Sequence, residues 1–202
     1  RIMPLLDAIS KRKWSVLLSE LEKGEHSFSE ELLSSIPLWL KQINKYSKNY
    51  YLLQQNLVVG HNDLVPSNVI WQDITPAIVD WDMVGWINPM QEFLTTAFAW
   101  SGIGAQRFNR EVLCAVFGGY VEAGGKITSD IHFAMDGIIV RLLSRLQFRL
   151  IQLTLHSMPQ KRNYFIEDKI IELMATIHYA VSNLDTFDKL VTEFSRKKYR
   201  RK

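Results

Sequence analysis

Residues 61–82 constrain the fold of this chain most, because they place polar side chains at the ends of two short runs of β-prone residues. The two runs, 69–71 and 78–79, are separated by a turn at 72–76, and this spacing predicts a β-hairpin. A hairpin returns the residue after its second strand to the loop that precedes its first strand. We therefore expect three polar residues to meet in one small region: Asp63, Asn68 and Asp80.

The chemistry of these three side chains suits phosphoryl transfer. Such a reaction needs a carboxylate that accepts or orients the proton of the acceptor hydroxyl, and hard oxygen ligands for Mg²⁺. We interpret Asp63 as the candidate catalytic base, and Asn68 and Asp80 as the candidate metal ligands. Asp80 follows a run that reads as a buried strand, where an unpaired carboxylate is costly. The simpler alternatives are a turn or cap residue at Asp63 and a turn asparagine at Asn68.

The motif around these residues is close to a known pattern: H-N-D-L-x-x-x-N at 61–68, followed by V-D-W-D at 79–82. Protein kinases carry H-R-D-L-x-x-x-N and then D-F-G, whereas this chain has Asn62 in place of the arginine. With these departures it resembles the aminoglycoside phosphotransferase and choline kinase family of small-molecule kinases. The segment 88–94 supports the resemblance, because it is similar to the family's P-x-x-D-[IL]-A helix start, with Glu92 where aspartate is usual.

The resemblance implies a phosphotransferase with a protein-kinase-like fold that uses Mg²⁺ and ATP or GTP. Its acceptor would be a hydroxyl of a small molecule, such as an aminoglycoside, a choline-like amine or a sugar. Glu92 is implied to brace the catalytic loop through backbone amides. His61 is expected to hold the loop by packing and hydrogen bonding rather than to transfer a proton.

Other residues near the motif have open interpretations. Asp82 would share a strand face with Asp80 at the β period of two, as a supporting acid, a further metal ligand, a contact to a cationic substrate or plain surface. Trp81 and Trp86 suit a cation–π contact with a cationic substrate, although we expect core packing to be the role of these large aromatics. A helical stripe of arginines either holds an anionic substrate or pairs with neighbouring acids. The stripe consists of Arg141, Arg145 and Arg149.

The residues before His61 contain neither a glycine-rich phosphate loop nor a strand lysine of the V-A-I-K type. The resemblance implies that such features belong to a β-rich N-terminal lobe that clamps the nucleotide. We therefore expect residues 1–202 to form a single domain, the C-terminal lobe of a small-molecule kinase, with the N-terminal lobe missing. Such a lobe alone is expected to bind nucleotide weakly and to turn over little.

Composition sets broader limits. With 47% hydrophobic residues the chain can bury a substantial core, and it shows neither a run of about 18 apolar residues for a membrane span nor a secretory h-region. A single cysteine fits a reducing compartment, so we expect a cytoplasmic protein. The net charge is +3, but residues 196–202 hold six of the 24 basic residues, which leaves 18 against 21 acidic residues. We expect this tail to be disordered, with no nucleic-acid partner.

Apolar periodicity predicts helices over most of the remaining chain. They span 2–22, 32–46, 89–101, 105–123, 129–156, 162–183 and 185–198. The expected fold class is mainly α with a small β-hairpin insertion that carries the chemistry, the helical C-terminal lobe of a protein-kinase-like fold. Two other functions are compatible with the same residues: a catalytically inactive kinase-like binding or scaffold domain, and a metal-dependent hydrolase.

Overall fold

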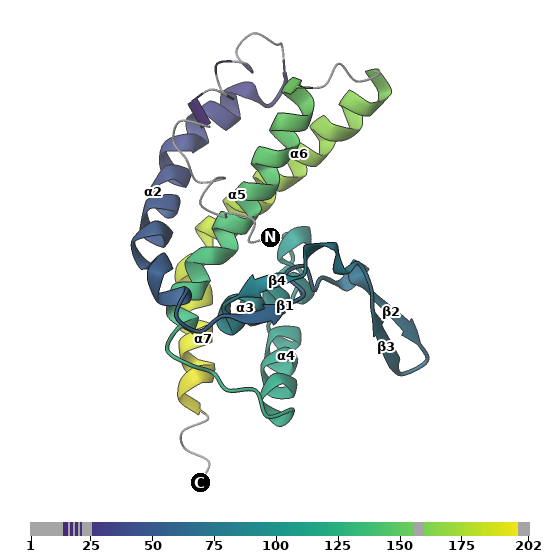
Figure 1. Cartoon of the computed structure of the whole chain (residues 1–202). Coiled ribbons are helices and arrows are strands. Elements are labelled where there is room, and N and C mark those ends of the chain that lie inside the picture. The colour runs from purple at the N-terminus through teal and green to yellow at the C-terminus, as the bar shows by residue number, and fades with distance from the viewer. Residues whose placement is uncertain are drawn as a thin grey trace.

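The structure of the protein is a computed structural model, which describes residues 14, 15, 17, 19, 21, 26–155 and 160–197. Helices dominate this part of the chain, and short strands form two separate two-stranded sheets (Figure 1). The helices are α2 (Ser29–Leu53), α3 (Pro89–Trp100), α4 (Arg110–Glu122), α5 (Ile131–Leu155), α6 (Gln160–Ser182) and α7 (Leu184–Lys197). The strands are β1 (Val58–Gly60), β2 (Val69–Gln72), β3 (Thr75–Ile78) and β4 (Gly85–Ile87). Between these elements lie the 3₁₀ turns η2 (Pro66–Asn68), η3 (Trp81–Met83) and η4 (Ile103–Ala105).

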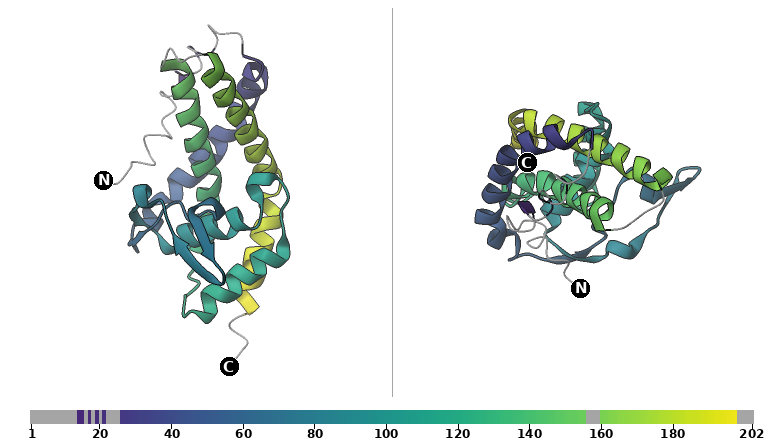
Figure 2. Two further views of the ribbon diagram at one scale, coloured as in Figure 1. Left: turned by 90° about the vertical axis from the view of Figure 1, so that its right-hand side faces the viewer. Right: turned by 90° about the horizontal axis from the view of Figure 1, so that it is seen from above.

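The long helix α5 lies at the centre of the helical part, where it contacts α2, α3, α6 and α7 (Figures 1 and 2). Its apolar positions recur at the helical spacing and bury one continuous stripe. The stripe consists of Ile131, Met135, Ile139, Leu143, Leu146, Leu150 and Leu153. Side chains from the neighbouring helices, among them Trp39, Leu94 and Ile170, are fully buried in the same cluster. None of the described helices is long and apolar enough to cross a membrane.

The predicted helices from 89 onward are confirmed, with differences at their ends. Helix α4 begins at Arg110 rather than at 105, because Asn109 caps it. The Oδ1 atom of Asn109 accepts hydrogen bonds from the backbone N–H groups of Glu111 at 2.9 Å and Val112 at 3.1 Å. Helix α2 is longer than predicted and runs through Pro37 without a break.

The predictions for the two ends of the chain fall only partly on described residues. Most of the helix predicted over 2–22 lies outside the described residues, although the described positions within it are helical. Residues 196 and 197 of the expected disordered tail are instead helical, because α7 extends to Lys197. Residues 198–202 of that tail lie outside the described residues.

The predicted hairpin is confirmed: β2 and β3 pair antiparallel, with Val69 opposite Ile78 and Ile70 opposite Ala77. The expectation that Asp80 follows a buried strand is wrong, because every residue of β3 is exposed. The hairpin projects away from the helices instead of packing on them (Figure 1). The second sheet, in which β1 pairs antiparallel with β4, has no counterpart in the sequence-based prediction.

A buried asparagine, Asn88, fixes the start of α3 relative to its neighbours. Its Oδ1 atom accepts the N–H of Met90 at 2.9 Å as an N-terminal cap. Its Nδ2 atom donates to the carbonyl of Leu53 at 3.3 Å, at the end of α2, and to the carboxylate of Asp130 at 3.0 Å, just before α5. Because α3 carries Glu92, this network determines where that acid stands relative to the 61–68 loop.

Candidate active site

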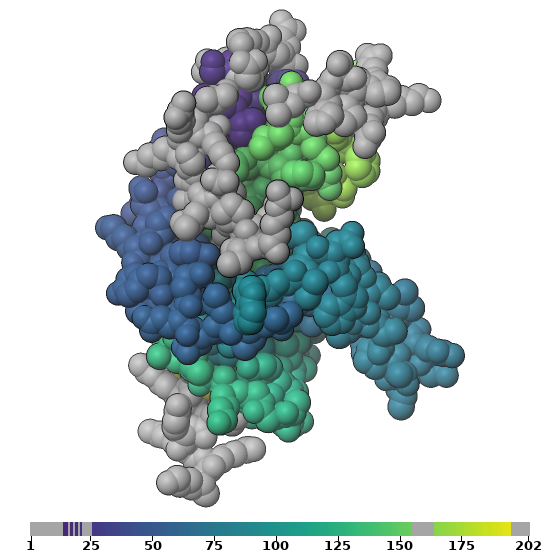
Figure 3. Space-filling view, viewed as in Figure 1, coloured from purple at the N-terminus to yellow at the C-terminus, as the bar shows by residue number. Residues whose placement is uncertain are grey.

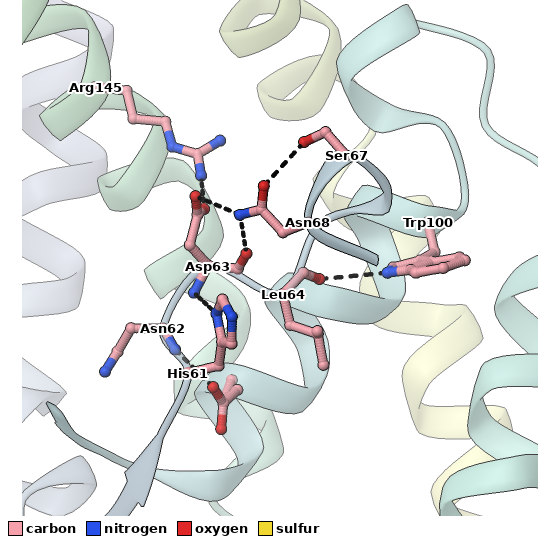
Figure 4. A network of polar contacts seen from close by, with 9 residues as sticks. His61, Asn62, Asp63, Leu64, Ser67, Asn68, Trp100 and Arg145 are labelled. Atoms are coloured by element: carbon pink, nitrogen blue, oxygen red, sulfur yellow. Dashed lines mark hydrogen bonds and ion pairs between the residues drawn. The ribbon is translucent and has the colours of Figure 1, made fainter. Parts of the chain in front are cut away.

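Strand β1 leads directly into the candidate catalytic loop, residues 61–68 (Figure 4). Asn62 adopts the left-handed backbone conformation, with φ 64°, which asparagine enters more readily than most residues. Its Nδ2 atom donates to the carbonyl of Gly85 on β4 at 3.1 Å. The residue that replaces the arginine of the kinase motif therefore ties the loop to the β1–β4 sheet.

Asp63 and Asn68, five residues apart, are brought into direct contact by the loop. The Asn68 side chain is nearly buried, and its Nδ2 atom donates to the Asp63 carbonyl at 2.9 Å and to the Asp63 Oδ2 atom at 3.3 Å. This orients the Asn68 Oδ1 atom away from Asp63, where the hydroxyl of Ser67 donates to it at 3.4 Å. The 3₁₀ turn that begins at Pro66 supports the arrangement. The nitrogen of the Asn68 amide is thus occupied by Asp63, and its oxygen, which accepts only from Ser67, keeps a lone pair for a ligand.

Val79, the residue before Asp80, is hydrogen-bonded to both ends of the 61–68 loop. The N–H of Val79 donates to the Asn68 carbonyl at 3.0 Å, and the Val79 carbonyl accepts a hydrogen bond from the ring of His61 at 3.0 Å. Asp80 itself has φ 64° and ψ 62°, and its exposed side chain makes no hydrogen bond or ion pair with another described residue. These contacts hold the residue before Asp80 against both ends of the loop, and the Asp80 carboxylate has no partner among the described residues.

His61 is buried, and both of its ring nitrogens are occupied by the backbone. The Nδ1 atom accepts the N–H of Asp63 at 3.3 Å, so the proton of the neutral ring resides on Nε2, which donates to Val79. The ring also packs against the indole of Trp81, with 4.7 Å between ring centroids. His61 therefore joins the loop to the end of the hairpin and has no nitrogen free to receive a proton from a substrate.

Glu92 reaches from the first turn of α3 to the loop. Its Oε1 atom accepts the backbone N–H of Asn62 at 2.7 Å, the contact that the resemblance implies for the acid at this position. The longer glutamate fits because Gly60 leaves room for it: a Cβ atom at position 60 would lie 2.7 Å from the Glu92 carboxyl carbon and 2.6 Å from a methyl group of Ile87. A glycine on β1 thus accommodates the extra methylene of Glu92.

Replacing Gly60 with alanine is expected to displace Glu92 from the loop and to lower the free energy of unfolding by about 1–3 kcal/mol, since the added methyl overpacks this site. Glu92→Asp, which shortens the acid, should recover part of this loss when combined with Gly60→Ala. Urea unfolding of the two single variants and the double variant measures the coupling between the positions. Strictly additive effects would show that Gly60 does not make space for Glu92.

A cation that the sequence did not assign to the site lies against the candidate base. The guanidinium of Arg145 on α5 forms an ion pair with the Oδ1 atom of Asp63 (Figure 4). Arg141, one turn earlier, interacts electrostatically with Asp63 and Glu92, and partial burial of its side chain lowers the pKa of its guanidinium, as does the neighbouring charge of Arg145. The spacing of the arginines was the only sequence signal for this arrangement, and it left their partners open.

Arg149, the third member of the stripe, does not join the site. Its Nη1 atom donates to Gln152 Oε1 at 2.8 Å, and its guanidinium lies 5.8 Å from the centre of the Phe148 ring. The stripe thus divides into two arginines at the candidate base and one that makes local contacts on α5.

The predictions for the residues after Asp80 need correction. Asp82 does not share a strand face with Asp80, because Trp81–Met83 forms a 3₁₀ turn, and its side chain is exposed. Trp81 and Trp86 do not pack in the core: they are 53% and 57% exposed, because the turn and the edge of β4 lie outside the helical cluster. A substrate contact for either indole stays a prediction.

A separate surface hollow of about 530 Å³ lies between α2 and α6, where Ser35 and His178 are 2.9 Å apart. The Ser35 hydroxyl donates to the carbonyl of Glu31 at 2.7 Å, so it accepts from His178 Nε2 and is not activated as a nucleophile. The Glu31 carboxylate approaches that same ring nitrogen at 3.6 Å, so it does not orient the ring from behind. The hollow therefore offers no catalytic constellation to compete with the 61–68 loop.

The groups that could hold Mg²⁺ at the loop are the Oδ1 atom of Asn68 and the carboxylate of Asp80. Within the described ranges, no three His, Cys, Asp or Glu side chains gather into a metal cluster. Mg²⁺ does not require such a cluster, because one or two carboxylates, waters and substrate phosphates usually complete its coordination. One amide oxygen and one carboxylate without a partner among the described residues fit this mode of binding.

Comparison of the sequence with models of known protein families identifies the family of this chain. The model of the phosphotransferase enzyme family (APH) matches residues 9–125, which include the loop, the hairpin and the start of α3. This match covers more than half of the chain, and the protein belongs to this phosphotransferase family. No curated protein and no solved structure matches the sequence.

Proposed function

We propose that the protein is an ATP- or GTP-dependent kinase that phosphorylates a hydroxyl of a small molecule. The observation that carries this proposal is the contact between Asp63 and Asn68, supported by the two hydrogen bonds that join Val79, the residue before Asp80, to Asn68 and His61. This arrangement combines one carboxylate for the acceptor hydroxyl with two oxygen ligands for a metal. Membership of the phosphotransferase family supports the reaction type.

Each side chain has a distinct part in the proposed mechanism. Asp63 orients the acceptor hydroxyl and takes its proton as the oxygen attacks the γ-phosphorus. The bond between the γ-phosphorus and the β,γ-bridging oxygen breaks, and the nucleoside diphosphate leaves. Asn68 Oδ1 and the Asp80 carboxylate hold Mg²⁺, which neutralises charge on the nucleotide phosphates when it is bound. His61 and Glu92 keep the loop in place from its two sides, and thereby preserve the distances between the reacting groups.

We further propose that the described helical part is the C-terminal lobe of a protein-kinase-like fold, and that a β-rich lobe covers the exposed strands. The support is a group of large apolar side chains on the two sheets, the β2–β3 turn and η3 that stay exposed in the described part of the chain, because large exposed apolar side chains close in the fold often mark a contact region. The group consists of Val58, Val59, Ile70, Trp71, Ile74, Trp81, Met83 and Trp86. The lobe in this position would close over the nucleotide at the 61–68 loop.

Thermal unfolding of the natural full-length protein tests the kinase proposal. ATP with Mg²⁺ is expected to raise the melting temperature, because a ligand at about 100 times its dissociation constant adds about 2.7 kcal/mol to the free energy of unfolding. The same nucleotide with EDTA should give a much smaller shift. No shift with ATP or GTP would favour a catalytically inactive scaffold. Release of phosphate from esters without any nucleotide would favour a metal-dependent hydrolase.

A further inference from the structure

The candidate base, Asp63, lies between a neutral amide on one side and a cationic guanidinium on the other (Figure 4). Its Oδ2 atom accepts a hydrogen bond from Asn68, on the side of the candidate metal ligands. Its Oδ1 atom contacts Arg145, which comes from α5. A molecule that reaches Asp63 from the α5 side therefore meets Arg145 before it meets the candidate metal ligands.

Arg141 and Arg145, on this side of Asp63, have N–H donors that no described residue accepts. A guanidinium carries five N–H donors in a rigid fork that suits carboxylate and phosphate oxygens. Arg145 directs part of its fork to Asp63, and its side chain is 46% exposed. Arg141 forms no hydrogen bond or ion pair with another residue in the described part of the chain, although it lies in the field of Asp63 and Glu92. Two guanidinium groups thus flank the base with most of their hydrogen-bonding capacity unused.

Arg145 lies at the surface of the molecule, where its side chain is exposed. Figure 3 shows the surface indented between the green surface of the α5 and α6 region and the blue-teal surface of the strand region. The two guanidinium groups attract an anionic acceptor and repel a cationic one, and the carboxylates of Asp63 and Glu92 offset part of this charge. An anionic group would also compete with Asp63 for Arg145 and so free the Oδ1 atom to receive the hydroxyl proton.

We propose that the acceptor of this phosphotransferase carries a carboxylate or phosphate group next to its reactive hydroxyl, and that Arg141 and Arg145 bind this group beside Asp63. The inference rests on the proposed function and specifies its substrate class. Binding of the anionic group places the hydroxyl at Asp63 and releases that carboxylate from Arg145 in the same step. The two oxyanions share the chemistry that a guanidinium recognises, and experiment separates them.

Anion binding to the natural full-length protein, saturated with Mg²⁺ and a non-hydrolysable ATP analogue, tests this inference. Isothermal titration with inorganic phosphate should show binding that Arg145→Gln and Arg141→Gln each weaken about tenfold or more, since each removes charge-assisted hydrogen bonds. Arg149→Gln is the matched control, because it removes the same charge from the same helix, and it should leave the affinity unchanged. Arg145→Lys, which keeps the charge but loses the fork, should bind with intermediate affinity.

A matched series of alcohols then identifies the anionic group. Glycerate and glycerol phosphate differ from glycerol and aminopropanediol only in the group beside the hydroxyls. Wild-type protein should bind at least one of the two anionic members about tenfold more tightly than glycerol, and should bind the amine no better than glycerol. The preferred anion distinguishes a carboxylate from a phosphate acceptor.

Three outcomes would overturn the inference: no phosphate binding with or without the nucleotide analogue, binding that is equal in wild type and both Gln variants, or binding that is seen without the analogue and lost when the analogue is present. The last outcome would assign the arginines to the nucleotide phosphates.

The proposed function is judged separately, by binding of the nucleotide and Mg²⁺ to the same samples. Nucleotide binding that persists in Arg145→Gln while phosphate binding is lost supports both proposals. Nucleotide binding without any phosphate site refutes only the substrate class.

Discussion

Asp63→Asn is expected to lower the rate of phosphoryl transfer by a factor of about 10²–10⁴, because an amide cannot take the proton of the acceptor hydroxyl. Nucleotide binding should change far less, since the side chain that faces the candidate metal ligands keeps its shape. The amide oxygen of the new residue can still accept the hydrogen bond that Asn68 donates at 3.3 Å. A large loss of kcat with little change in nucleotide affinity is therefore the pattern to look for.

The measurement compares single-turnover rates and nucleotide affinity in the natural full-length protein, once a nucleotide-consumption screen of small alcohols has supplied an acceptor. Asp73→Asn is the control, because Asp73 is an exposed acid in the turn of the hairpin and its backbone also has a positive φ, 53°. It removes the same charge without touching the loop. A base role for Asp63 would be wrong if both variants turned over at the wild-type rate.

The parts of the site that depend on short-range spacing could be predicted from the sequence. Two β-prone runs joined by a short turn can pair in few registers, and the observed pairing of Val69 with Ile78 follows from this. The interval from Asp63 to Asn68, which contains Pro66, likewise permits a compact turn in which both side chains meet. The helices were predictable for the same reason, because their apolar residues recur with a strong period.

Contacts between distant segments could not be predicted in this way. Strands β1 and β4 have three residues each, too few to give a periodic signal, yet their pairing anchors Asn62 through Gly85. The ion pair of Arg145 with Asp63 joins residues 82 positions apart. Regular spacing of arginines shows that they share a helix face, but only the packing of α5 against the loop determines which acid they meet.

Burial was the property that sequence predicted least well around the site. Tryptophan is highly buried on average, and this average favoured the core for Trp81 and Trp86. Both are exposed because they lie on the turn and strand beyond the helical cluster. The β3 strand was expected to be buried for a similar reason. In the structure it belongs to a projecting hairpin, and its apolar side chains are exposed to solvent. Composition alone does not reveal which apolar side chains a fold leaves exposed to solvent.

Asp80→Asn is expected to lower Mg²⁺-dependent turnover by more than about 100-fold, because it removes the carboxylate that holds the metal in the proposed mechanism. Loss of a group that merely orients a ligand costs 10–100-fold in metal affinity, and loss of the ligand itself should cost more. The fold should not change, since Asp80 makes no hydrogen bond to another described residue and asparagine is well tolerated at its φ of 64°. Asp80→Asn therefore separates metal binding from structure more cleanly than a larger substitution would.

Turnover of the natural full-length protein as a function of Mg²⁺ concentration measures this effect, with melting temperatures of the same samples as the check on folding. The Asp80→Asn protein should melt within the error of wild type, show little stabilisation by ATP with Mg²⁺, and regain some activity only at high metal concentration. The exposed hairpin acid Asp73, changed to asparagine, should leave the Mg²⁺ dependence intact. Wild-type turnover with an unchanged Mg²⁺ dependence in Asp80→Asn would mean that other groups hold the metal, and the carboxylate that follows Val79 would then have no part in phosphoryl transfer.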